Sequence, residues 1–156
     1  IGVLLFGDCP LIDPAIITRA VSIFQSDSQY DLVSNDLYTT WPPGMEVEIF
    51  KVSALVDSAA RCTDTTIREH GTLYLRQHPD IYRLYNFDAP VHLRRPDLSL
   101  EVDTMEDMTV IERIITQFQG RIDFTLDEII EFMDRNPSIG QLNRGIKRRW
   151  KPYRGE

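Results

Sequence analysis

Segments with the pattern of strands alternate along this chain with segments with the pattern of helices, and this alternation indicates the fold class. A strand is indicated by a run of apolar residues or by alternation of apolar and polar residues, and a helix by apolar residues three and four positions apart. The predicted strands are residues 1–7, 30–35, 45–52, 81–88 and 98–103, and the predicted helices are residues 15–26, 53–62, 64–79, 104–118 and 125–137. The repeated order of a strand followed by a helix predicts an α/β fold with a mostly parallel sheet flanked by helices.

Residues typical of helix starts support three of these helices. Asp13 is followed by Pro14, which suits an N-cap with proline at the first helical position. Thr104 with Asp107 three residues later has the spacing of a capping box, and residues 125–128 repeat that pattern. Helix starts are therefore expected near residues 14, 105 and 126.

Length and composition indicate one folded domain. The chain has 156 residues, of which 42% are hydrophobic and 26% charged, as in ordinary globular proteins. No apolar run approaches the roughly 20 residues of a membrane span, and no leader pattern is present. Cys9 and Cys62 lack the spacing of a zinc site, which favours reduced thiols. We therefore expect a cytoplasmic protein with no membrane partner.

The charge is distributed unevenly. The net charge of -7 argues against a general nucleic-acid binder, yet residues 144–154 hold six of the 17 Lys and Arg residues. Residues 1–143 form an acidic body, and residues 144–156 form a basic C-terminal tail. Such a tail could contact phosphate, nucleic acid or a membrane, or it could be a solubilising end or dock onto its own body.

The opening run, residues 1–7, is apolar from its first residue. A continuous apolar run is typical of a strand buried on both faces, which needs neighbours on either side. The pattern therefore suggests that the fold is incomplete at the N-terminus.

Two carboxylates follow predicted strands. Asp8 comes after Gly7 at the end of the first strand, and Asp103 ends the strand at 98–103. In open α/β sheets, ligands bind beyond the carboxyl ends of the strands. Mg²⁺ prefers oxygen ligands and is often held by one or two carboxylates. The two acids could therefore share a magnesium ion, although an Asp before a helix is often only a cap.

Five ordered motifs give the chain a resemblance to a known family. They are "GDCPLIDP", "YDLVSN", "PPGMEVEIF", "REHGTLYL" and "LEVDTMEDM". Together, over residues 3–135, they resemble the spore coat polysaccharide biosynthesis protein F family, sugar cytidylyltransferases related to the acylneuraminate and 3-deoxy-manno-octulosonate enzymes. The resemblance implies a Rossmann-like fold and a Mg²⁺-dependent transferase that couples CTP to a sugar and releases pyrophosphate.

The resemblance also implies roles for particular residues. Asp8 and Asp103 correspond to the metal-holding, catalytic acids of the octulosonate branch, whereas the sialic acid branch lacks an acid at the first position. Glu46 and Glu48 correspond to acids near the sugar pocket, although a solvent-facing acidic edge is the alternative. The remaining substrate-binding candidates are Asn35, Arg68 and His70.

One departure from the family affects the expected activity. Family members begin with a Gly-, Arg-, Ser- and Lys-containing loop that receives the nucleotide, and no such loop precedes Ile1. Residues 1–143 are thus expected to be the C-terminal portion of a single nucleotidyltransferase domain, inactive alone. A non-catalytic module for partner binding or homodimerisation is the alternative, and a docking protein that acts through its basic tail is a third.

Overall fold

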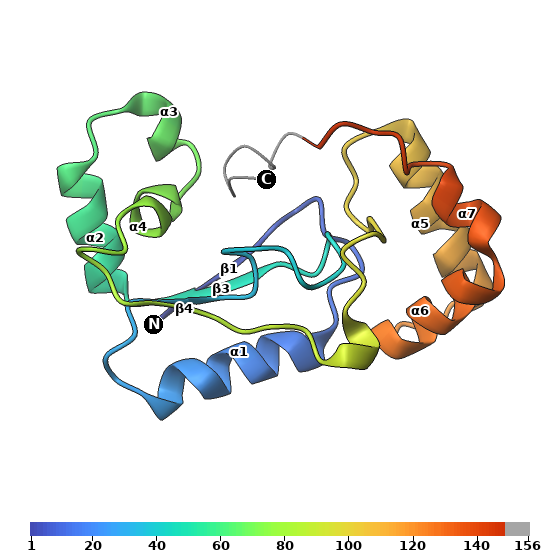
Figure 1. Ribbon diagram of the computed structural model, residues 1–156, viewed down its shortest axis with the longest axis horizontal. Helices are drawn as coiled ribbons and strands as arrows, with labels where there is room; N and C mark the ends of the chain where they lie inside the picture. Colours follow the sequence, from blue (N-terminus) through green and yellow to red (C-terminus); the bar gives the residue numbers. More distant parts are fainter. Residues whose placement is uncertain (149–156) are drawn as a thin grey trace.

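The computed structural model describes residues 1–148 and contains a four-stranded mixed sheet with helices around it (Figure 1). The strands are β1 (Gly2–Leu5), β2 (Leu32–Ser34), β3 (Val47–Phe50) and β4 (Leu84–Asn86). The helices are α1 (Pro14–Ser26), α2 (Val52–Arg61), α3 (Thr65–Arg68), α4 (Leu73–Gln77), α5 (Met105–Gln117), α6 (Leu126–Arg135) and α7 (Pro137–Gln141), with a 3-10 turn η1 at Val91–Leu93. The α/β class predicted from the alternation is therefore confirmed.

The expectation of a mostly parallel sheet is wrong. The strand order is β1-β3-β2-β4, and β3 is antiparallel to both of its neighbours, whereas β2 and β4 are parallel. The physical reason lies in the connection between β2 and β3, residues 35–46, which is a loop rather than a crossover helix. A loop of this kind can return the chain to the adjacent position running the opposite way, whereas a parallel neighbour needs a longer crossover.

The opening strand also differs from its expected environment. β1 lies at the edge of the sheet, and its side chains alternate between half-buried and exposed. Ile1, Val3 and Leu5 are 65%, 45% and 45% exposed. The described residues therefore do not bury this strand on both faces, and its outward side chains leave an apolar strip on the surface.

Two further predicted elements are broken by local backbone geometry. The segment at 64–79 forms two short helices, α3 and α4, because Gly71 adopts a φ of +49 between them. The segment at 98–103 is not a strand. Its backbone bonds to loops instead, with Leu100 N donating to Pro43 O at 2.6 Å and Val102 N to Asp8 O at 2.8 Å.

The close approach of the segment at 98–103 to the β2–β3 loop requires a glycine. Gly44 has a φ of +102, and a Cβ there would lie 2.4 Å from the carbonyl carbon of Leu100. Only glycine avoids both the backbone strain and the collision. The loop and the segment are therefore fixed against each other, next to the sheet.

The predicted helix starts are confirmed. Asp13 Oδ1 accepts a hydrogen bond from Ala15 N at 2.8 Å, and Thr104 and Thr125 both form complete capping boxes. Asp13 also reaches a second helix, because its Oδ2 accepts from Leu126 N, 113 residues away, at 2.9 Å. One carboxylate thus contacts the first turns of both α1 and α6.

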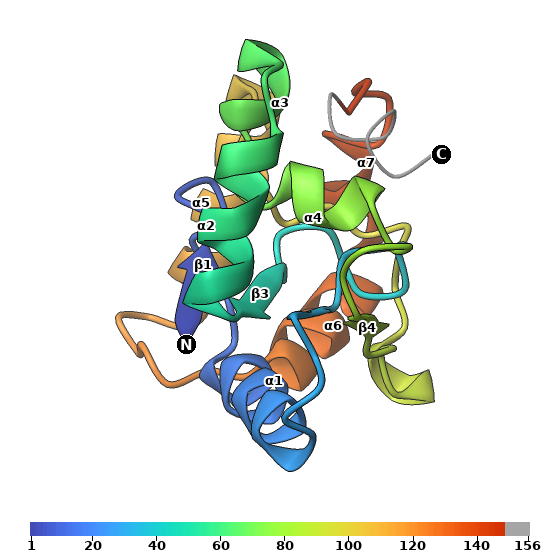
Figure 2. The ribbon, with the colours of Figure 1, turned by 90° about the vertical axis from the view of Figure 1, so that its left-hand side faces the viewer.

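The main core lies between α1, one face of the sheet, and α5 and α6. Val47 and Ile49 of β3 belong to it together with Ala20 and Phe24 of α1, and the two elements are in contact. A smaller cluster of Ala54, Leu75 and Tyr82 joins α2 and α4 at the other end of the sheet (Figure 2). Because β3 alternates, Glu46 and Glu48 point away from the main core and toward the opposite face. None of the helices within residues 1–148 is long and apolar enough to cross a membrane.

Candidate functional site

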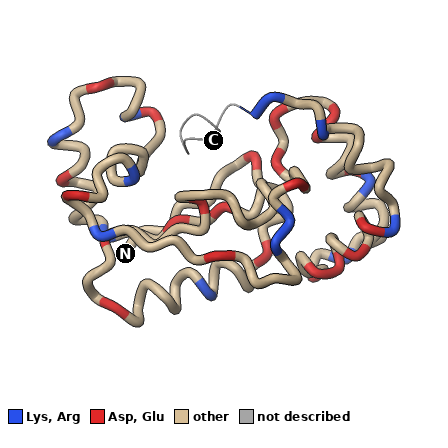
Figure 3. The backbone as a smooth tube through the Cα atoms, in the orientation of Figure 1, with Lys and Arg blue, Asp and Glu red and all other residues tan. Residues whose placement is uncertain are grey.

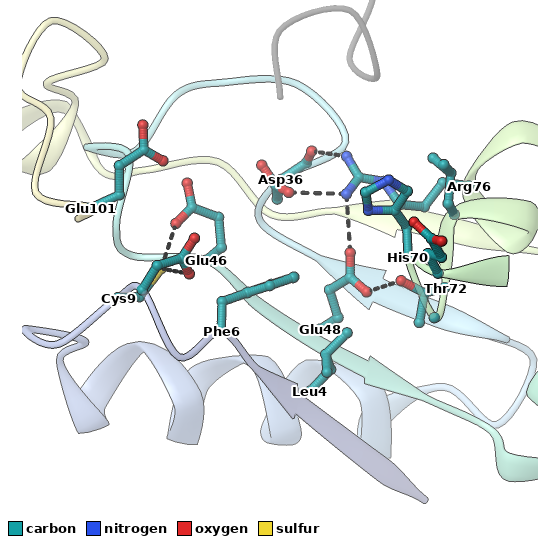
Figure 4. Close-up of a pocket in the computed structure, with 14 residues that line it drawn as sticks. Leu4, Phe6, Cys9, Asp36, Glu46, Glu48, His70, Thr72, Arg76 and Glu101 are labelled. Carbon is teal, nitrogen blue, oxygen red and sulfur yellow. Dashed lines mark hydrogen bonds and ion pairs between the residues drawn. The ribbon is translucent and has the colours of Figure 1, made fainter. Parts of the chain in front are cut away.

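A cavity of about 440 Å³ lies on the face of the sheet opposite α1 (Figure 4). It is lined by β1 and the turn after it, by the end of β2, by β3 and by the segment from α3 to α4. Its apolar lining residues are Leu4, Phe6 and Leu73, and its polar and charged ones are Asp8, Cys9, Asp36, Glu46, Glu48, Glu69, His70, Thr72, Arg76 and Glu101. Figure 3 marks acidic residues along the central strands and the loops beside them.

Arg76 is the central cation of this cavity. Its Nη1 donates to Asp36 Oδ2 at 3.0 Å and to Glu48 Oε1 at 3.2 Å, and its Nη2 donates to the backbone oxygen of Asp36 at 2.5 Å. Glu48 is fully buried and also accepts a hydrogen bond from the Thr72 hydroxyl. A buried carboxylate is tolerable only when it is paired and hydrogen-bonded, and Arg76 with Thr72 supplies both.

Glu46 lies on the same face of the sheet, close to the turn that follows β1. It is 8% exposed, accepts a hydrogen bond from Gly44 N at 2.7 Å and contacts the Cys9 thiol at 3.4 Å. The exposed fractions of Glu46 and Glu48, 8% and 0%, rule out a solvent-facing acidic edge. Both acids contribute to the cavity wall.

Cys9 is held as a neutral thiol. Burial raises its pKa far above the usual range, and the negative charges of Glu46 and Asp8 raise it further. A thiolate is the reactive form of cysteine, so this environment disfavours nucleophilic chemistry at Cys9. Its role in the wall is to pack and to donate to neighbouring carboxylates.

The two candidate metal acids come from segments that the fold joins. Val102 N donates to Asp8 O at 2.8 Å, which brings the chain around Asp103 beside the turn that carries Asp8. Asp8 and Glu101 line the cavity, whereas Asp103 is not among the lining residues and its side chain is 32% exposed. These hard oxygen donors suit Mg²⁺ chemically. Among residues 1–148, no group of three or more His, Cys, Asp or Glu residues is arranged to hold a metal ion.

Arg148, at the end of the described chain, is buried behind these acids. Its Nη1 and Nη2 donate to Asp107 at 3.0 and 2.7 Å, its Nε lies 3.2 Å from Glu101, and Nη1 lies 3.8 Å from Asp103. Asn143 Nδ2 also donates to Asp107, at 2.8 Å. The described part of the basic tail, residues 144–148, therefore docks onto the acidic body through Arg148, whereas residues 149–156 lie outside the described chain.

Asp107 connects this cluster to α5. Besides Arg148 and Asn143, it accepts from the backbone amides of Asp103 and Thr104 as the acidic member of the capping box. Burial alone would raise the pKa of Asp107, but the hydrogen bonds from Arg148 and Asn143 outweigh it and lower the pKa from 3.8 to about 2.

This pKa shift predicts a specific loss of stability in acid. Because the pKa of Asp107 is lower in the folded chain than in the unfolded one, its stabilisation is complete above about pH 4 and is lost as the pH falls toward about 2. The amount is about 2 kcal/mol, at 1.36 kcal/mol per pKa unit. In urea unfolding between pH 2 and 6, the free energy of unfolding of the parent chain should fall by this amount as the pH is lowered, whereas Asp107→Asn should not show this loss. Asp127→Asn, an exposed acid in the first turn of α6, is the control and should keep it.

The structure brings some predicted substrate-binding residues together and leaves others apart. Glu46, Glu48 and His70 line the cavity with Asp8. Asn35 does not line it, because its Nδ2 donates to Met45 O at 2.6 Å and its Oδ1 accepts from Val47 N at 2.9 Å, which fixes the start of β3. Arg68 donates to Ala59 O and Cys62 O at the end of α2, beside a separate cavity of about 200 Å³.

Several lining residues were missed by sequence reasoning. Asp36 directly follows Asn35 at the end of β2, so the strand-end rule applied to Asn35 could have included it. Thr72 and Arg76 are four residues apart, which places them on one side of a helical turn. A polar pair at that spacing was a usable signal. Arg148 does not line the cavity, and the basic tail suggested docking onto the body but not its partner Asp107, which is 41 residues away.

No protein-family model matches this chain, but individual proteins are similar to it. The spore coat polysaccharide biosynthesis protein SpsF of Bacillus subtilis is 32% identical over 135 residues, covering 85% of this chain and 54% of that protein. The uncharacterized protein MJ1063 of Methanocaldococcus jannaschii is 27% identical over 148 residues, covering 95% of this chain and 58% of that protein. The chain thus spans somewhat more than half the length of these relatives.

A solved structure agrees with the sequence comparison. A cytidylyltransferase from Leptospira borgpetersenii has a TM-score of 0.84 and 28% sequence identity to this chain, covering 94% of this chain and 60% of that one. The chain is therefore a distant homologue of SpsF and of a cytidylyltransferase of known structure over most of its own length.

Proposed function

We propose that this chain supplies the sugar-binding and metal-binding part of a cytidylyltransferase that joins CTP to a sugar in surface polysaccharide biosynthesis. The observation that carries the proposal is the carboxylate-lined cavity beside Asp8, in a chain that matches a solved cytidylyltransferase with a TM-score of 0.84. Ligands of open α/β folds bind at such strand ends. The cavity volume, about 440 Å³, is in the range of small-molecule sites.

The proposed reaction is a nucleotidyl transfer. A hydroxyl oxygen of the sugar attacks the α-phosphorus of CTP, a new P–O bond forms, and the hydroxyl proton is released to solvent. The bond from that phosphorus to the oxygen bridging to the β-phosphate breaks, and pyrophosphate leaves. Asp8 and Asp103 would hold Mg²⁺, which when bound neutralises charge on the phosphates.

The chain's own residues position the sugar in this scheme. Leu4 and Phe6 offer an apolar surface to one face of the ring, and Glu46 offers a carboxylate to its hydroxyl groups. Arg76 and Thr72 hold Glu48 in a fixed orientation, so the wall is already arranged before the sugar enters. Such preorganised positioning is the main contribution that a protein makes to phosphoryl and nucleotidyl transfer.

A non-catalytic module that binds a partner is the second candidate. The observation that favours it is the exposed apolar strip on β1, formed by Ile1, Val3 and Leu5. Contiguous exposed apolar side chains often mark interaction surfaces. The strip is on the edge of the sheet, and the retained acids of the cavity have no evident use in such a module.

Calorimetric titration of the full-length protein with CTP separates the two candidates. The transferase proposal expects CTP binding that requires Mg²⁺ and that weakens at least tenfold when EDTA replaces the metal. ATP titrated under the same conditions controls for general nucleotide binding. Absence of CTP binding with Mg²⁺ present, or binding indifferent to the metal, would contradict the transferase and leave the partner-binding module.

A further inference from the structure

The described end of the chain is tied to the segment at 98–103 and to α5 by two buried side chains, Asn143 and Arg148. Asn143 Nδ2 donates to the Ser99 backbone oxygen at 3.2 Å and to Asp107 Oδ1 at 2.8 Å. Arg148 Nη2 donates to the same Asp107 oxygen at 2.7 Å. We call Asn143 and Arg148 the C-terminal clasp, because they converge on one carboxylate from a single short stretch of chain.

Arg148 contacts three acids that follow one another along the chain. Its Nη1 and Nη2 donate to the two carboxylate oxygens of Asp107, its Nε lies 3.2 Å from Glu101 Oε1, and its Nη1 lies 3.8 Å from Asp103 Oδ2. A guanidinium is a rigid planar fork, so carboxylates that contact its different nitrogens are fixed in position relative to one another. A lysine ammonium is a point charge on a flexible stem and lacks this geometry.

The clasp also determines where the backbone of Asp103 lies. Asp107 Oδ2, which Arg148 contacts through Nη1, accepts a hydrogen bond from Asp103 N at 3.1 Å. On the other side, Val102 N donates to Asp8 O at 2.8 Å. The position of Asp103 relative to Asp8 therefore depends on an Asp107 carboxylate that the clasp holds in place.

Stability alone does not account for these polar contacts. Replacing a buried ion pair by apolar residues of similar volume is often neutral or stabilising, so a buried arginine is weak evidence for a purely stabilising role. The contacts supply a fixed orientation of the carboxylates, which apolar packing does not. This orientation matters because, among the described residues, the segment at 98–103 belongs to no strand of the sheet and is held by contacts with loops and with the clasp.

We propose that Asn143 and Arg148 are positioning residues for the metal site, which hold Asp103 where its carboxylate shares a divalent cation with Asp8. The inference rests on the proposed function, which assigns Asp8 and Asp103 to Mg²⁺. Arg148 is not itself a ligand, because a guanidinium has no acceptor to offer a metal ion. Residues that orient metal ligands in this way contribute roughly 10- to 100-fold to metal affinity.

Two variants alter the geometry of the clasp without altering its charge. Asn143→Ala removes the bridge between Ser99 and Asp107, and Arg148→Lys keeps a cation while losing the fork. The charge is kept constant because a cation close to the site would itself repel a metal ion. Each variant of the full-length protein is titrated with Mn²⁺, which takes oxygen ligands as Mg²⁺ does, and free Mn²⁺ is measured by electron paramagnetic resonance. Each variant should raise the dissociation constant about tenfold or more.

Asp103→Asn and two matched controls define the site that is titrated. Asp103→Asn should weaken Mn²⁺ binding at least as much as either clasp variant. Asn86→Ala also removes an asparagine that bridges two segments, from Leu37 N to Asp88, but in β4, at the opposite edge of the sheet from β1. Arg121→Lys alters an arginine in exposed ion pairs. Both controls should bind Mn²⁺ as the parent does.

Urea unfolding separates positioning from stabilisation. It gives the folded fraction of each variant under the conditions of the titration, so that dissociation constants are compared for folded protein. A clasp that only stabilised the chain would lower the free energy of unfolding and leave the Mn²⁺ affinity of the folded protein unchanged. Arg148→Lys provides the test if Asn143→Ala does not fold. Unchanged affinity in every clasp variant that folds, an equal loss in the controls, or failure of both clasp variants to fold would overturn the proposal.

Failure of this inference can be told apart from failure of the proposed function. Mn²⁺ binding that depends on Asp103 and on the clasp, without release of pyrophosphate from CTP and a sugar, would preserve the role of the clasp and overturn the transferase. Pyrophosphate release by a protein whose Mn²⁺ affinity is indifferent to the clasp would preserve the transferase and overturn the role of the clasp. Absence of Mn²⁺ binding by the parent would also overturn that role.

Discussion

Replacing Asp103 by asparagine is expected to lower the Mg²⁺-dependent turnover of the full-length protein by about 10²-fold or more, the scale seen when one preorganised charge-stabilising group is removed. Asparagine keeps the size of the side chain but loses the negative charge proposed to hold Mg²⁺. The fold should be retained, because the Asp103 side chain is 32% exposed and its ion pair with Arg148, at 3.8 Å, is long.

The measurement is release of pyrophosphate at saturating CTP across a range of Mg²⁺ concentrations. Asp80→Asn, which alters an exposed acid away from the cavity, should turn over normally. Urea unfolding of Asp103→Asn should show a stability within about 1 kcal/mol of the parent, because the ion pair that is lost is long and Asp103 is partly exposed. Turnover within twofold of the parent would remove Asp103 from the metal site.

Replacing Arg76 by methionine is expected to destabilise the folded chain by about 3–5 kcal/mol, the cost of leaving one partner of a buried ion pair unpaired. Methionine preserves most of the aliphatic length, so the loss is chiefly of charge. Glu48 would remain fully buried without its cation, and Asp36 would lose contacts from both Nη1 and Nη2. Free energies of unfolding in urea provide the measurement.

Two companion variants identify the cause of that loss. Arg135→Gln removes an exposed arginine paired with Glu131 on α6 and should cost well under 1 kcal/mol. Combining Arg76→Met with Glu48→Gln should recover part of the loss, because the buried charge is then neutral. If the single variant lost less than about 1 kcal/mol, Arg76 would not hold the cavity wall as the contacts indicate.

Features determined by neighbours in sequence could be predicted. Asp13 with Pro14 starts α1, and Thr104 with Asp107 starts α5, because a cap depends on residues within one turn. The shared face of Glu46 and Glu48 could likewise be predicted, since alternation in a strand is local. These local rules located most of the helices and one wall of the cavity.

Features determined by distant partners could not be predicted from the residues alone. The direction of β3 depends on which strands it pairs with, and the loss of the strand at 98–103 depends on a loop that approaches at Gly44. The role of Arg76 depends on Glu48, 28 residues away in the sequence, and the role of Arg148 depends on Asp107, 41 residues away. Neither arginine occupies a position that periodicity marks as buried.

The double hydrogen bond of Asp13 has a consequence for how the chain opens. Its Oδ1 accepts a hydrogen bond from the first turn of α1, and its Oδ2 accepts one from the first turn of α6. If either helix start frays and Asp13 moves, the other helix start loses its acceptor. Local opening at these two places is therefore coupled, although 113 residues separate them. In hydrogen exchange, the first amides of α1 and α6 should belong to one sub-global unfolding unit, so that the two helix starts lose protection together.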